Sequence, residues 1–136
     1  MEQEKRFPRD FASLEAIFAF VAEFYADSGL AGRESSEVEL IIEEIFTNMV
    51  KYSKDGKQDI AIRLRRQGDS VEIRLTDFDV EPFDYAKTPE VDPQRLLAQK
   101  RSGGLGLHLV RKMSDSFSYE YVDRHNTVTI VKRLGA

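Results

Sequence analysis

The sequence predicts an α+β fold, a two-layer sandwich in which three helices pack on one face of a mixed, mainly antiparallel sheet. Three observations predict it. Two stretches near the N-terminus carry apolar residues at helical spacing. Two later pairs of segments alternate apolar with polar residues across turn sequences, as hairpins do. A long proline-containing loop and a short third helix separate the two hairpins, an order typical of helices layered on an antiparallel sheet.

The composition is that of one globular domain. With 136 residues the chain is long enough to bury one continuous core, so we expect a single domain over residues 1–136. A net charge of −4 argues against general binding to nucleic-acid phosphates, and the absence of cysteine excludes disulfides and thiolate metal sites. We see no signal peptide and no apolar run that could span a membrane. We therefore expect a cytoplasmic protein.

Two helices are predicted in the first half of the chain. The first covers about Phe11–Asp27, and Gly29 is a suitable residue to end it. The second runs from Ser36 to about Tyr52, because Ser36 and Glu39 fit a capping box at its start.

Alternating patterns predict the strands. DIAIRLRRQ (59–67) and VEIRLTD (71–77) flank turn residues and form one expected hairpin, and FSYEYV (117–122) and TVTIVKR (127–133) form another. A third helix is expected over Leu105–Met113. The segment KRFPR (5–9) is a candidate edge strand, although Pro8 limits its pairing.

Glu44 and Asn48 stand out on the second helix. They lie one turn apart on the shoulder of the apolar stripe, so both side chains can face a pocket while the helix anchors them. A carboxylate there can accept a proton, and a carboxamide oxygen suits magnesium. The same spacing also fits two solvated positions at the edge of the core.

Three glycines, Gly103, Gly104 and Gly106, stand at the entry to the third helix. Amide groups in the first turn of a helix have no internal partner and carry partial positive charge, and glycine lets an anion approach them. Lys100 and Arg101 add positive charge just upstream. The pattern favours phosphate binding, but it also fits a hinge or a tight loop-to-helix entry.

Asp77 ends a predicted strand and precedes the long loop Phe78–Gly104. A carboxylate at the end of a strand can accept a hydrogen bond from an exocyclic amine such as that of adenine. An aspartate at this point also fits the start of a turn. A loop of this length inside a small domain is usually functional or mobile.

Three segments in order, ELIIEEIFTNMVKYS, LTDFDVEPFD and SGGLGLHLVRKMSD, resemble the ATP-binding boxes of the GHKL superfamily of histidine-kinase-like ATPases. Within it they resemble the small bacterial anti-sigma-factor serine kinases. The resemblance covers about Ser36–Lys132 and implies the two-layer α/β sandwich of that superfamily, the Bergerat fold.

The resemblance also implies site residues. Asn48 would be the magnesium ligand, Glu44 the base that activates the attacking hydroxyl, and Asp77 the reader of the adenine amino group. Residues 78–101 would form the lid, and Thr127 would contact adenine indirectly. The residues expected to wrap the phosphates of ATP or ADP are Ser102, Gly103, Gly104, Leu105 and Gly106.

Members of this family phosphorylate a serine on a small anti-anti-sigma (STAS-type) partner and sequester a sigma factor when that partner is not available. They are commonly homodimers. The resemblance therefore implies an ATP- and Mg²⁺-dependent protein serine kinase that is also an anti-sigma factor. Two alternatives stay open: a GHKL module that acts only by sequestering a partner, and a kinase with another target, such as a response-regulator-like protein.

One position departs from the family pattern. Asp79 stands two residues after Asp77, where the family usually has glycine. A side chain there would crowd the base, and its charge would repel phosphates or recruit another cation. This departure is what favours the non-catalytic alternative.

Overall fold

The computed structural model describes residues 2–30, 35–53, 56–81, 110 and 112–134. The strands are β1 (Glu2–Phe7), β2 (Ile60–Gln67), β3 (Ser70–Asp77), β4 (Ser116–Val122) and β5 (His125–Arg133). The helices are a short 3₁₀ turn η1 (Phe11–Ser13), α1 (Leu14–Asp27) and α2 (Ser35–Tyr52). The expected α+β class is confirmed.

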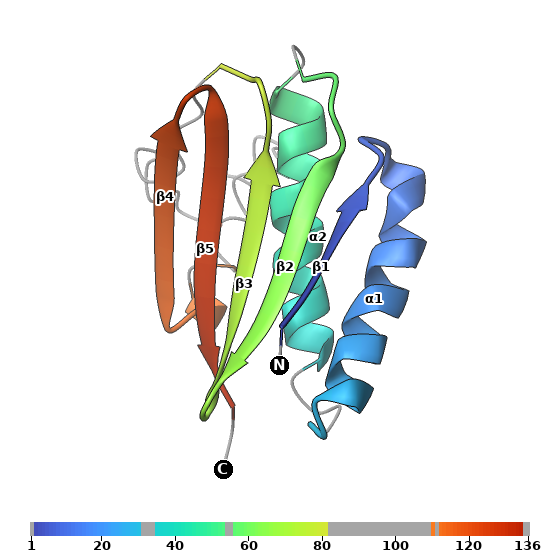
Figure 1. Ribbon diagram of the computed structural model, residues 1–136, viewed down its shortest axis with the longest axis vertical. Helices are drawn as coiled ribbons and strands as arrows, with labels where there is room; N and C mark the ends of the chain where they lie inside the picture. Colours follow the sequence, from blue (N-terminus) through green and yellow to red (C-terminus); the bar gives the residue numbers. More distant parts are fainter. Residues whose placement is uncertain (1, 31–34, 54–55, 82–109, 111, 135–136) are drawn as a thin grey trace, which may run out of the picture.

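The five strands form one sheet in the order β1-β2-β3-β5-β4. All of the pairings between these strands are antiparallel, so the described sheet is not mixed as we expected. The candidate edge strand is confirmed as β1, and Pro8 follows its last residue, where a missing N–H costs no ladder bond. β5 lies between β3 and β4, so the second hairpin adds to the first through its later strand (Figure 1).

Both long helices lie on the same side of the sheet (Figure 1). Their apolar faces and the strands enclose one core, in which Phe7 meets Phe20 edge-on with ring centroids 5.6 Å apart. The first helix ends as expected: Gly29 has a φ of 68°, and the N–H of Leu30 donates to the Tyr25 carbonyl at 3.0 Å. This is a Schellman motif, for which glycine is the favoured residue.

Both long helices start at other residues than expected. Residues 11–13 form a 3₁₀ turn before α1, with Asp10 as its cap. The second helix already includes Ser35, so Ser36 is inside the helix rather than its cap. Of the expected third helix, Val110, Lys112 and Met113 are helical and the rest lies outside the described residues.

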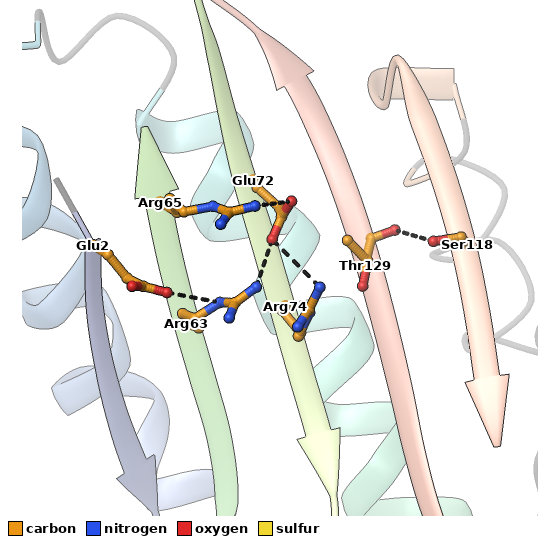
Figure 2. Close-up of polar contacts among 7 residues, drawn as sticks. All are labelled: Glu2, Arg63, Arg65, Glu72, Arg74, Ser118 and Thr129. Atoms are coloured by element: carbon orange, nitrogen blue, oxygen red, sulfur yellow. Dashed lines mark hydrogen bonds and ion pairs between the residues drawn. The ribbon is translucent and has the colours of Figure 1, made fainter. Parts of the chain in front are cut away.

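The other face of the sheet is polar. Along β2, the buried residues Ile60, Ile62 and Leu64 face the helices, and Arg63 and Arg65, at alternate positions, face away. Figure 2 shows three arginines of this face, Arg63, Arg65 and Arg74, gathered around Glu72 of β3. Among the described residues, the two long helices therefore cover one face of the sheet and leave the other face polar (Figure 1).

Two strands and one helix end on the same side of the molecule. The carboxyl ends of β1, α2 and β3 lie at the same end of the molecule (Figure 1, top). Segments far apart in the chain, around residues 9, 49 and 77, meet at this end. Asp77 and the part of α2 that carries Asn48 are found at this end.

Candidate nucleotide and phosphotransfer site

α2 carries the two residues expected to do chemistry. Asn48 is 3% exposed, and its Nδ2 donates a hydrogen bond of 2.7 Å to the carbonyl oxygen of Glu44, one turn earlier. This bond commits the nitrogen of the carboxamide to the helix, so the oxygen is the atom that remains for a ligand. An amide oxygen is a donor that magnesium accepts. The residues present therefore fit a magnesium ligand at this position.

A pocket of about 380 Å³ opens beside these residues. It is lined by Phe11, Leu14, Glu43, Glu44, Thr47, Asn48 and Lys51. Glu44 and Asn48 thus share one cavity, as their helical spacing predicted. Sequence reasoning did not find that Phe11 and Leu14, from the start of the first helix, would form its other wall, because they lie about thirty residues upstream and carry no motif.

The surroundings of Glu44 suit a proton acceptor. Burial raises the pKa of the Glu44 carboxyl above its ordinary value, the nearby charge of Glu43 adds to the rise, and the charge of Lys51 opposes it. A carboxylate with a raised pKa binds a proton more strongly than an exposed glutamate does. This is the direction in which general bases are tuned.

Asp77 is fully buried at the end of β3. Because Ile73 and Leu75 face the helices, strand alternation places Asp77 on the same face. Its Oδ1 forms an ion pair with Nη2 of Arg9, and Nη1 of Arg9 donates to the carbonyl oxygen of Met49 at 3.1 Å. Arg9 thus connects the end of β3 to the residue that follows Asn48 on α2.

Arg9 was not predicted from the sequence. It follows Pro8 at the end of β1, and nothing in its spacing distinguishes it from the other basic residues of KRFPR. Only the fold brings it to a carboxylate 68 positions later in the chain.

Asp79 has a φ of 53°, in the left-handed region that glycine adopts without strain. Aspartate is among the residues that tolerate this conformation. Its Oδ1 accepts a hydrogen bond of 2.8 Å from Nε of Arg124, which lowers the pKa of the Asp79 carboxyl. The cation that pairs with this carboxylate is therefore Arg124 of the same chain, which lies in the turn between β4 and β5.

Thr127 lies on a different face of the sheet from Asp77. In β5, the buried residues Asn126 and Val128 face the helices and Thr127, between them, faces away. This placement argues against the expected contact of Thr127 with adenine. The β5 residue opposite Asp77 in register is Asn126.

Asn126 is 1% exposed and held from two sides. Its Oδ1 accepts from the hydroxyl of Tyr119 at 2.5 Å, and its Nδ2 donates to the carbonyl of Glu81 at 3.0 Å. In the sequence, Val128 and Ile130 alternate with Thr127 and Thr129, and this alternation is the signal that separates Asn126 from Thr127.

The residues expected to wrap the phosphates lie outside the described residues. The same is true of most of the expected lid, of which residues 78–81 are described. These residues are Lys100, Arg101, Ser102, Gly103, Gly104, Leu105 and Gly106.

Within the described part of the chain, no group of three or more His, Asp or Glu side chains is arranged to hold a metal ion. A metal at Asn48 would therefore take further ligands from elsewhere, as magnesium does from phosphates and waters. Among the described helices, none has the length and apolar character needed to cross a membrane.

Comparisons with known proteins agree on the fold. The family described as the histidine kinase-like ATPase domain matches residues 7–132. Among solved structures, a chain in the crystal structure of the SiaB–SiaC complex from Pseudomonas aeruginosa is similar, with a TM-score of 0.66 and 17% identity over 95% of this chain and 88% of that one. No curated protein matches the sequence.

Proposed function

The chain belongs to the family of histidine kinase-like ATPase domains, and from this premise we propose that it is a cytoplasmic, ATP- and Mg²⁺-dependent protein serine kinase that also acts as an anti-sigma factor. Its substrate would be a serine of an anti-anti-sigma (STAS-type) partner, and it would sequester a sigma factor when that partner cannot bind. Membership of an ATPase family implies binding of ATP or ADP. The similar structure contains two proteins in complex, SiaB and SiaC, which supports a role in partner binding.

The observation that carries the proposal is the pairing of Glu44 with Asn48 in one pocket. A half-buried carboxylate with a raised pKa stands one helical turn from a carboxamide whose nitrogen is already bonded. A domain that only held a nucleotide would need the carboxamide but would have no use for the carboxylate. The pair therefore favours phosphoryl transfer over binding alone.

The proposed reaction is in-line transfer to the partner. The hydroxyl oxygen of the serine forms a bond to the γ-phosphorus of ATP, the bond between that phosphorus and the β–γ bridging oxygen breaks, and ADP leaves. The proton of the hydroxyl passes to the carboxylate of Glu44. Positioning and charge stabilisation supply most of the rate enhancement in such transfers, with a smaller part from the base.

Each of the other predicted site residues has a distinct role in this reaction. Asn48 would hold the magnesium ion, which when bound neutralises negative charge on the phosphates. Asp77 would accept a hydrogen bond from the adenine amino group. Residues 100–106 would surround the phosphates at the entry to the third helix.

The test is a phosphotransfer assay with labelled ATP, Mg²⁺ and a candidate STAS-type protein. Wild type should yield phosphoserine on the partner, and Glu44→Gln should lower the rate by about 10²–10⁴-fold, the usual contribution of a general base. Glu43→Gln is the matched control, because it removes a carboxylate from the same pocket and should keep most of the activity.

Two results would separate the alternatives. ATP binding without transfer to any candidate partner, by wild type and by Glu44→Gln alike, would support a module that acts by sequestration. Equal transfer rates for wild type and Glu44→Gln would contradict the role of Glu44.

Light scattering of the purified protein tests the homodimer that the family resemblance implies.

A further inference from the structure

The contact between Arg9 and Asp77 is the most buried ion pair among the described residues. The Arg9 side chain is 12% exposed and that of Asp77 is 0% exposed. By comparison, the arginine that pairs with Asp79 is 50% exposed. A buried ion pair adds little net stability compared with apolar residues, because desolvation of its two charges offsets most of their attraction. We therefore look for the reason for this ion pair in the function of Asp77 rather than in the stability of the fold.

Arg9 is held on several sides. Its Nη1 donates to the Met49 carbonyl, and its Nη2 contacts the Asp77 carboxylate. A Cβ placed on Gly56 would overlap the guanidinium, so the Gly56 backbone packs directly against it. The guanidinium thus lies between the end of α2, the end of β3 and the segment before β2.

The backbone that carries Arg9 is also fixed. The carbonyl of Pro8 accepts hydrogen bonds from the amide of Asp10 at 2.8 Å and from the hydroxyl of Ser13 at 2.7 Å. The carboxylate of Asp10 in turn caps the η1 turn through the amide of Ala12 at 2.9 Å. Arg9 therefore projects from a closed turn rather than from a free terminus.

This geometry decides which hydrogen bonds Asp77 can make. A carboxyl group in a buried position tends to bind a proton, and a neutral acid both donates and accepts hydrogen bonds. An adjacent guanidinium favours the ionised form, which only accepts. An acceptor-only group pairs with the 6-amino group of adenine and leaves the 6-oxo group of guanine or hypoxanthine facing another acceptor.

We propose that Arg9 is a positioning residue that holds Asp77 as an ionised, acceptor-only carboxylate and thereby makes the site select 6-aminopurine over 6-oxopurine nucleotides. The inference rests on the proposed function, in which Asp77 reads the adenine amino group. It adds that base selection depends on a residue outside the three motifs. A positive charge at this position, rather than a particular side-chain shape, is what the selection requires.

The experiment measures dissociation constants of ATP and inosine triphosphate by calorimetry with the full chain and Mg²⁺. Wild type should bind ATP more tightly by about 10- to 100-fold, the range expected for one hydrogen bond to a charged group. Arg9→Gln should reduce this ratio to near unity, and Arg9→Lys, which keeps the charge, should retain most of it. Arg65→Gln, on the polar face of the sheet, is the control and should leave the ratio unchanged.

A second route covers the case in which Arg9→Gln does not fold, as judged by thermal melting. Gly56→Ala keeps the guanidinium but displaces it, and should also lower the ratio. Asp77→Asn, whose amide can donate and accept, should lower it as far as Arg9→Gln does.

The outcomes are distinguishable. Failure of wild type to bind ATP would overturn the proposed function and the inference with it. Loss of discrimination in Asp77→Asn together with an unchanged ratio in Arg9→Gln or Gly56→Ala would overturn the inference alone. Tighter ATP binding by Arg9→Gln would also overturn it, because Arg9 would then compete with the base for Asp77.

Discussion

Glu72 organises the polar face of the sheet, and its removal is expected to destabilise the fold. Its Oε1 accepts from Nη2 of Arg63 at 2.8 Å and its Oε2 accepts from Nη2 of Arg65 at 3.0 Å (Figure 2). Arg74 lies 3.6 Å from the same carboxylate. The Glu72 side chain is only 11% exposed, so solvent and salt screen these contacts less than they screen a surface pair. The perturbation is Glu72→Gln, which keeps the shape and removes the charge.

The size of the effect follows from these contacts. The carboxamide of Gln can accept one of the two hydrogen bonds through its oxygen but presents N–H groups to the other arginine. The loss is therefore close to one charged hydrogen bond, about 1.5–3 kcal/mol of unfolding free energy. At about 4 °C per kcal/mol for a chain of this size, Tm should fall by roughly 6–12 °C.

The effect should depend on pH. Burial raises the pKa of Glu72, but the hydrogen bonds from Arg63 and Arg65 and the charges of Arg65 and Arg74 lower it by more, so the net shift is downward. A carboxyl whose pKa is lower in the folded state stabilises the fold above its unfolded-state pKa. That contribution is lost as the pH falls through the folded-state pKa. The gap between wild type and Glu72→Gln should therefore close in acid.

Urea denaturation followed by circular dichroism, at neutral pH and at a pH below the Glu72 pKa, measures both free energies. Glu120→Gln on β4 is the control, because this exposed carboxylate should contribute less than about 0.5 kcal/mol. A gap for Glu72→Gln below about 0.5 kcal/mol at neutral pH, or a full gap that persists in acid, would refute the reasoning.

Three further predictions concern the site. The charge of Glu43 raises the pKa of Glu44 and the charge of Lys51 lowers it. Glu43→Gln should therefore move the acid limb of the phosphotransfer pH profile to lower pH, and Lys51→Met should move it to higher pH. Shifts of both variants in the same direction would contradict Glu44 as the base. Asp79→Gly should change the dissociation constant of ATP by less than about threefold, well under the effect of one charged hydrogen bond, because Arg124 already binds the Asp79 carboxylate; a larger gain in affinity would show that this carboxylate faces the nucleotide. Chelation of Mg²⁺ with EDTA should abolish phosphotransfer, and addition of excess Mg²⁺ should restore it. Transfer that persists under EDTA would exclude the proposed use of the metal.

Much of the fold was predictable because it is encoded locally. The helical spacing of apolar residues predicted α1 and α2 to within a few residues, and alternation predicted both hairpins. The three motifs predicted a family that the comparison with known families confirms. The sheet order was not predictable in the same way, since periodicity says which face of β5 is buried but not which strand lies beside it.

Site residues divide along the same line. Helical geometry alone placed Glu44 and Asn48 on one side of α2, and the pocket they share confirms that expected adjacency. The contact of Thr127 with adenine stays a prediction, but strand alternation puts Asn126, and not Thr127, on the face of the sheet that carries Asp77. The sequence contains this distinction, because the alternation of apolar and polar residues in β5 shows which of its residues face the helices.

Local periodicity and ordered motifs determined the class, the hairpins, the family and the helical pair Glu44 and Asn48, because each depends on residues that are neighbours along the chain. Tertiary structure alone decided that Arg9 meets Asp77 and that Phe11 walls the pocket beside Glu44. Such contacts join residues tens of positions apart. They arise from how the elements pack, and no short-range pattern in the chain specifies them.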